Sequence, residues 1–107
     1  MSQNPDPRTN DQGFLVNSGD WCEAVALQLA QANNIQLDSQ HWEIIWFIRR
    51  YYDRYQHLPN ARVFTKAIAR EFGETKGNSR YLHQLFPEGP LKYACKLAGL
   101  PKPPTCI

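Results

Sequence analysis

The sequence predicts an all-α fold: an orthogonally packed bundle of about five helices, with a candidate short N-terminal β segment and a flexible C-terminal arm. Three observations predict it. Apolar residues recur at intervals of three and four in five separate segments, which is the period of one helical face. Asparagine, aspartate, glycine and proline separate these segments, as they do where helices begin and end. Three prolines within residues 101–104 exclude a helix there and favour an extended arm.

The chain has 107 residues, a length that suits one domain. We divide it into a loosely ordered N-terminal segment (1–13), a helical domain (14–99) and a C-terminal arm (100–107). The candidate β segment is Gly13-Phe14-Leu15-Val16. The helices are expected at about 21–32, 40–56, 60–72, 78–86 and 90–98.

The second predicted helix is apolar on two sides, which is typical of the most buried helix of a bundle. Its three arginines, Arg49, Arg50 and Arg54, are expected on the remaining side. Gly99 follows the last helix and is expected as its left-handed cap.

The composition excludes several classes of protein. The longest apolar run, residues 44–48, is far shorter than the roughly 20 residues of a membrane span. The first residues lack the basic and apolar blocks of a secretory signal. We therefore expect a cytoplasmic protein in a reducing environment, with no membrane partner.

Charge is unevenly distributed along the chain. Residues 1–43 hold one basic and six acidic side chains, whereas residues 44–107 hold eleven basic and four acidic ones. A basic C-terminal part favours an anionic partner, either an acidic protein surface or nucleic acid. A solvated helical surface explains the same pattern equally well.

The three cysteines are too few for a disulfide-stapled scaffold, and their odd number leaves one unpaired. The sequence has no Cys-x2-Cys or His-x3-His spacing, so we expect no metal site and no cofactor.

Cys106 is the first candidate for chemistry, because it is the penultimate residue of the proline-rich arm. At about 3.1 Å per residue, the segment from Gly99 to Ile107 extends roughly 25 Å, enough to place a thiol inside a partner's pocket. Prolines also reduce the conformational entropy that binding would cost. Lys102 and Lys96 would favour the reactive thiolate, and the carboxylate of Ile107 opposes it.

Cys95 is the second candidate, and two interpretations stand side by side. It lies on the apolar stripe of the last helix, where a cysteine usually serves as a small buried hydrophobe. Alternatively, it is a resolving partner for Cys106 at Cys-x10-Cys spacing, with Gly99 as the bend that brings the two thiols together.

Several segments resemble the DsrC/TusE family of sulfur carriers. They are residues 76–82, 85–90 and 95–103, with the ending Cys106-Ile107. The likeness covers nearly all of the chain and weakens only in the first dozen residues.

The resemblance implies a small helical cytoplasmic protein whose penultimate cysteine, here Cys106, accepts and passes on sulfur as a persulfide. It implies two kinds of partner: a sulfur-donating complex of the TusBCD or DsrEFH type, and a sulfur-accepting enzyme such as sulfite reductase or a tRNA-thiolating enzyme. Members resembling DsrC itself carry a second cysteine on the last helix, matched here by Cys95, and the two cysteines can share a sulfur atom. Such a protein is a co-substrate rather than a stand-alone catalyst.

The alternative is a DNA-binding regulator. The predicted helices 60–72 and 78–86 are joined by a glycine-bearing turn, as in a helix-turn-helix. Arg80 would begin the second helix, and several basic residues of this region would contact phosphates. Tyr81, Leu82 and Leu85 oppose this interpretation, since they have the spacing of core residues.

Overall fold

The structure, a computed structural model, describes residues 8–103. It is built from five α-helices and one short 3-10 turn, Ser18–Asp20. The helices are α1 (Glu23–Ala32), α2 (Ser39–Tyr55), α3 (Ala61–Phe72), α4 (Ser79–Leu85) and α5 (Pro90–Leu97). The predicted all-α class is therefore confirmed.

Local sequence explains where most of these helices begin. The side chains of Asp38, Asn60 and Asn78 accept hydrogen bonds from backbone N–H groups of the first turns of α2, α3 and α4. Pro90 opens α5, where its missing N–H costs nothing. The first helix begins at Glu23, two residues later than predicted, because the Ser18–Asp20 turn takes up the preceding residues.

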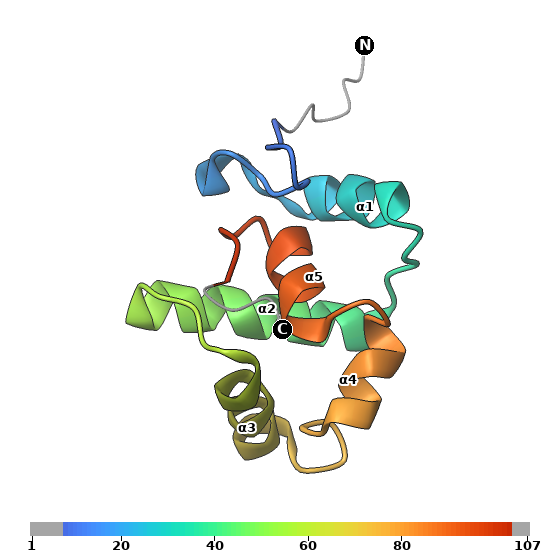
Figure 1. The fold of residues 1–107 in the computed structure, drawn as a ribbon, viewed down its shortest axis with the longest axis vertical. Helices are drawn as coiled ribbons and strands as arrows, with labels where there is room; N and C mark the ends of the chain where they lie inside the picture. The colour runs from blue at the N-terminus through green and yellow to red at the C-terminus, as the bar shows by residue number, and fades with distance from the viewer. Residues whose placement is uncertain (1–7, 104–107) are drawn as a thin grey trace.

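The centre of the bundle is α5, which contacts each of the other four helices. Figure 1 shows α5 between α1 and α2, with α3 and α4 on the opposite side of α2. The sequence pointed to α2 as the most buried helix, and α2 does bury Ile44, Ile45 and Ile48. However, every residue from 94 to 100 is buried, so the junction of α5 with the arm lies in the core. None of the described helices combines the length and apolarity of a transmembrane segment.

The candidate β segment forms no strand. Within residues 8–103 the backbone makes one isolated antiparallel bridge, between Thr9 and Leu15. Gly13 has a φ of +85°, which turns the chain back on itself, and the side chain of Asn10 accepts the N–H of Phe14. Phe14 and Leu15 are both buried, so burial does not alternate as it would along a half-exposed strand.

Candidate functional site

The arm root, which we define as residues 97–100, is held at the end of α5 by a tight backbone turn. Gly99 has a φ of +72°, as expected for its predicted role as left-handed cap. Its N–H donates to the carbonyl of Lys96 at 3.3 Å, and the N–H of Leu100 donates to the carbonyl of Cys95 at 3.0 Å. These two bonds form a Schellman motif, which turns the chain sharply as the helix ends.

Two side chains from distant parts of the sequence complete this turn. The indole Nε1–H of Trp21 donates to the carbonyl of Leu97 at 2.8 Å. An Nη1–H of Arg49 donates to the carbonyl of Ala98 at 2.6 Å. The carbonyls of residues 95–98, which a helix end ordinarily leaves unpaired, are thus all satisfied.

Trp21 and Arg49 also contact each other. The guanidinium of Arg49 lies 4.0 Å from the centre of the Trp21 ring, a cation–π arrangement. The ring of Trp46 meets Trp21 edge-on, with ring centres 5.1 Å apart. A Cβ on Gly99 would lie only 2.5 Å from Cδ1 of Trp21, so this close approach requires glycine. The turn that begins the arm is therefore fixed by contacts from the segment before α1 and from α2.

Helical spacing in the sequence did not identify Trp21 or Arg49 as part of this site. Trp21 was expected inside the first helix, and Arg49 was expected on an exposed face. The structure places Trp21 just before α1 and Arg49 against α5. Both bonds join residues that are at least 49 positions apart, which a local pattern does not reveal.

Replacing Trp21 with phenylalanine is expected to lower the free energy of unfolding by about 1–2 kcal/mol, because the carbonyl of Leu97 loses its donor while most of the ring remains. Urea denaturation of both proteins measures the difference. The matched control is Trp46→Phe, because the indole of Trp46 makes no hydrogen bond to the described residues. An equal loss in both variants would contradict a role for the Trp21 hydrogen bond.

Cys95 is the one predicted site residue that the structure describes, and its side chain is completely buried. Burial raises the pKa of its thiol to about 12, because an apolar surrounding disfavours the charged thiolate. Leu100, the first residue of the arm, belongs to the same buried cluster. At neutral pH Cys95 is therefore a protonated and shielded thiol.

Cys106, the other predicted site residue, lies outside the described residues, so its geometry with respect to Cys95 stays a prediction. The structure follows the arm as far as Pro103. Leu100 and Pro103 are buried, and Pro101 and Lys102 are exposed. Cys22, the remaining cysteine, is exposed at the N-cap of α1.

Lys96 does not have the surroundings that the sequence suggested for it. Its side chain is buried, and its ammonium lies 4.7 Å from the ring centre of Tyr93 and 5.4 Å from that of Phe14. Burial, followed by the neighbouring Lys92, lowers the pKa of Lys96. This ammonium thus packs the N-terminal turn against α5, where Gly13 is its neighbour.

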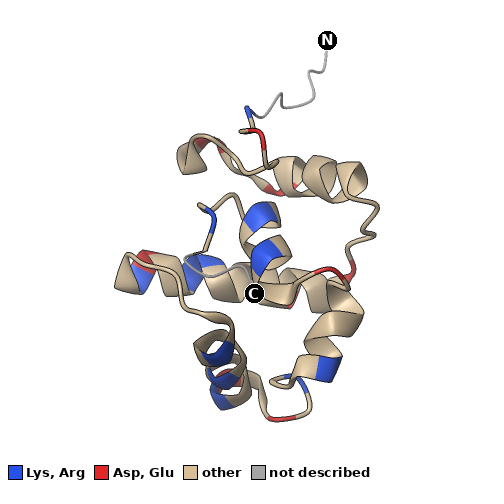
Figure 2. Ribbon diagram, viewed as in Figure 1, with Lys and Arg blue, Asp and Glu red and all other residues tan. Residues whose placement is uncertain are grey.

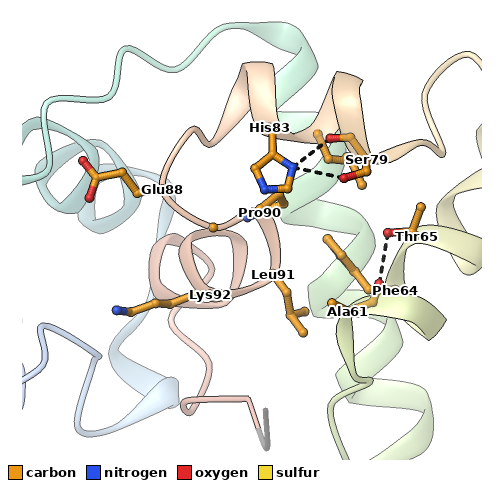
Figure 3. A pocket seen from close by; sticks show the side chains of 11 residues that line it. Ala61, Phe64, Thr65, Ser79, His83, Glu88, Pro90, Leu91 and Lys92 are labelled. Carbon is orange, nitrogen blue, oxygen red and sulfur yellow. Dashed lines mark hydrogen bonds between the residues drawn. The ribbon is translucent and has the colours of Figure 1, made fainter. Parts of the chain in front are cut away.

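A small pocket of about 250 Å³ lies among α3, α4 and the start of α5 (Figure 3). Ser79 and His83 line it, with Oγ and Nδ1 3.2 Å apart. Nδ1 also lies 2.9 Å from the carbonyl oxygen of Ser79, which can only accept, so Nδ1 carries the proton. A protonated Nδ1 cannot take the hydroxyl proton, and the pair is therefore not a nucleophile and its base. Residues 8–103 contain no group of three or more potential metal ligands.

The fold and the site together define a class of protein: a small helical bundle with a cysteine-bearing C-terminal tail whose root is fixed to the last helix. The family model for DsrC-like proteins matches residues 2–107. This chain belongs to the DsrC family, and the predicted DsrC/TusE membership is confirmed.

Curated relatives and solved structures agree with this assignment. The chain is 56% identical over 99 residues to sulfurtransferase TusE of Photorhabdus laumondii, a match that covers 92% of this chain and 89% of that one. It is 52% identical over 99 residues to sulfurtransferase TusE of Yersinia pseudotuberculosis, covering 92% of each chain.

The fold matches two solved DsrC structures. The NMR structure of DsrC from Allochromatium vinosum has a TM-score of 0.85 and 48% identity, covering 92% of this chain and 88% of that one. The crystal structure of the oxidized γ-subunit of dissimilatory sulfite reductase (DsrC) from Archaeoglobus fulgidus has a TM-score of 0.80 and 38% identity, covering 94% and 92%.

The DNA-binding alternative receives no support from these relatives. The structure also weighs against it, because Leu82 and Leu85 of α4 are buried in the core. A recognition helix needs an open face for the major groove, and α4 has only seven residues.

Proposed function

We propose that this chain is a sulfur-relay carrier: the thiol of Cys106 accepts sulfur as a persulfide and delivers it to a partner enzyme. The observation that carries the proposal is the arm root. Hydrogen bonds from Trp21 and Arg49 fix the turn at the end of α5, from which the cysteine-bearing C-terminal segment continues. The sulfurtransferase relatives, similar to this chain over most of its length, support the same role.

The proposed reaction is a transfer of sulfane sulfur that needs no external oxidant. The thiolate of Cys106 attacks the outer sulfur of a donor's cysteine persulfide, and the donor's S–S bond breaks. The products are a persulfide on Cys106 and the donor's thiolate, so charge and electrons balance. In delivery, a thiolate of the acceptor attacks the outer sulfur of the Cys106 persulfide, and Cys106 leaves as the thiolate.

For Cys95 we propose a resolving role that requires the arm root to open. A thiolate at Cys95 would attack the inner sulfur of the Cys106 persulfide, forming a disulfide and releasing hydrosulfide. The buried, protonated thiol cannot do this in the described conformation, because only the thiolate is a nucleophile. Burial of Cys95 thus keeps the persulfide intact until a partner binds.

The proposed partners are a sulfur-donating complex of the TusBCD or DsrEFH type and a sulfur-accepting enzyme, such as sulfite reductase or a tRNA-thiolating enzyme. The protein acts as their co-substrate. We propose a cytoplasmic location, because a reducing compartment keeps free thiols available.

Sulfur loading tests the proposal directly. The full chain is incubated with a cysteine desulfurase and L-cysteine, and the product is analysed by intact mass and peptide mapping. One added sulfur atom is expected on the C-terminal peptide that contains Cys106. A Cys22→Ser variant should load to the same extent. Sulfur found on Cys22 or Cys95 instead, or no added sulfur at all, would refute the assignment.

A further inference from the structure

A second hollow, of about 720 Å³, is a groove between α2 and α3. Its apolar lining, which we call the floor, comprises Phe47, Tyr51 and Tyr55 of α2 and Val63 and Ala67 of α3. Val63 is 42% exposed, and Tyr55, at the end of α2, is 49% exposed. Single exposed apolar side chains are common on protein surfaces, but here they lie together along one groove.

Four cations line the two sides of this groove. Arg50 and Arg54 lie one helical turn apart on α2, and Lys66 and Arg70 lie one turn apart on α3. Figure 2 shows basic positions on both helices. Glu71 is the one carboxylate among the lining residues, and it pairs with Arg50.

The remaining three cations have no ionic partner within the described part of the chain. Arg54, Lys66 and Arg70 make no ion pair with any described carboxylate. Like charges one turn apart destabilise a helix slightly, and both helices of the groove carry such a pair. On α2 the Arg50–Glu71 pair and the ring of Tyr55, 5.5 Å from Arg54, offset part of this repulsion. Lys66 and Arg70 on α3 have no such contact among the described residues, and an anionic partner would supply one.

We propose that the groove binds an acidic amphipathic helix of a partner protein. Its apolar stripe would rest on the floor around Val63, and carboxylates on either side of the stripe would pair with the cations of α2 and α3. This is the helix-in-groove mode of recognition, with anchors at positions i, i+3, i+4 and i+7. The basic charges at both sides also steer an acidic partner toward the site.

The shape of the groove favours a protein helix over nucleic acid. Its apolar lining consists of aliphatic groups and of rings among which only that of Tyr55, at the end of α2, is largely exposed. The ring of Phe47 contacts those of Tyr51, Phe64 and Phe72, so it offers no free face for a base.

A second copy of this chain does not fit the groove, because no helix within residues 8–103 carries more than two carboxylates. The C-terminal arm, residues 100–107, has no acidic side chain either. Charge complementarity therefore indicates a different protein as the occupant.

A synthetic peptide tests the proposal with the full chain. The probe is a fluorescein-labelled helix of about 14 residues, four turns, with leucines on one stripe and glutamates beside it. Its scrambled control has the same composition with leucines spread around the helix. Fluorescence anisotropy should show binding of the first peptide, and at least tenfold weaker binding of the second. Equal binding of both would overturn the proposal.

Variants locate the binding site. Lys66→Glu with Arg70→Glu should weaken binding at least tenfold, whereas Arg62→Glu with Arg80→Glu, an equal change of charge outside the groove, should weaken it less than twofold. Val63→Asn, at an exposed position, should weaken it about tenfold through lost apolar contact. Circular dichroism verifies that each variant is folded. Equal losses in the two charge-reversal pairs would overturn the proposal.

Competition distinguishes the other occupants. An excess of polyuridylate RNA, or of an octapeptide with the sequence of residues 100–107, should not displace the probe. Displacement by either would assign the groove to nucleic acid or to the arm and overturn the proposal. The assay needs no thiol, so Cys106→Ser should bind the probe normally, and a failure here leaves the sulfur-relay proposal standing.

Discussion

Replacing Cys106 with serine is expected to abolish sulfur uptake from a persulfide donor, reducing the initial rate to the background of a protein-free control. A serine hydroxyl is not ionised at neutral pH and forms no persulfide, and the arm holds no other thiol. Intact mass spectrometry during incubation with a loaded desulfurase measures the rate. Circular dichroism verifies that the variant is folded like the wild type.

The matched control for this variant is Cys95→Ala, which should still take up one sulfur atom per chain. Uptake by Cys106→Ser at even a tenth of the wild-type rate would contradict the proposal, because it would require Cys22 or Cys95 to receive the sulfur. Delivery to the acceptor enzyme should be lost to the same extent as uptake.

Cys95 and the start of the C-terminal arm are held in the same part of the core. Cys95 lies in the core, and its carbonyl is part of the turn that begins the arm. The turn that begins the arm is therefore built on the backbone of the buried Cys95. A partner that draws the arm outward would pull on Leu100, whose side chain is buried in the same cluster as Cys95.

Local sequence patterns were sufficient to predict much of this architecture. The helices expected from residues 60 and 78 begin there, with Asn60 and Asn78 as their N-caps, and Gly99 has the left-handed conformation that was predicted for it. These features depend on interactions within a few residues, so the local sequence is sufficient to predict them. Cys95, at helical spacing with Leu91 and Ala98, was correctly expected on a buried stripe.

Features that depend on tertiary contacts were not predictable in this way. A short apolar run at residues 13–16 suggested a strand, but Gly13 turns the chain before a partner strand can form. Arg49 was expected in solvent, because helical spacing cannot show that the end of α5 has a free carbonyl nearby.

Replacing Gly99 with alanine is expected to raise the alkylation rate of Cys95 about 30-fold. A left-handed φ costs alanine about 1–2 kcal/mol, and its Cβ would lie 2.5 Å from Cδ1 of Trp21. About 2 kcal/mol of lost stability at the arm root increases the open population about 30-fold, since each 1.4 kcal/mol is a factor of ten. Iodoacetamide labelling, followed by mass analysis of the Cys95 peptide, measures the rate.

The pH dependence shows whether Cys95 is buried in the dominant state. Only the thiolate reacts, and burial raises the pKa of the closed-state thiol to about 12, so the labelling rate should keep rising about tenfold per pH unit beyond pH 9. We expect this profile for both the wild type and Gly99→Ala, because the closed state remains the main one in each. A rate that levels off near pH 9 would mean that the thiol of Cys95 is exposed and has its ordinary pKa.

Global unfolding is the competing explanation for alkylation of Cys95, and a second variant distinguishes it from local opening of the arm root. Leu82→Ala removes a buried side chain of α4 and should destabilise the whole bundle by about 2–5 kcal/mol. If Cys95 opens locally, Leu82→Ala should raise its alkylation rate far less than Gly99→Ala at equal loss of global stability. Equal acceleration by both variants would mean that Cys95 is reached only by unfolding, and the arm root would then have no separate role in exposing it.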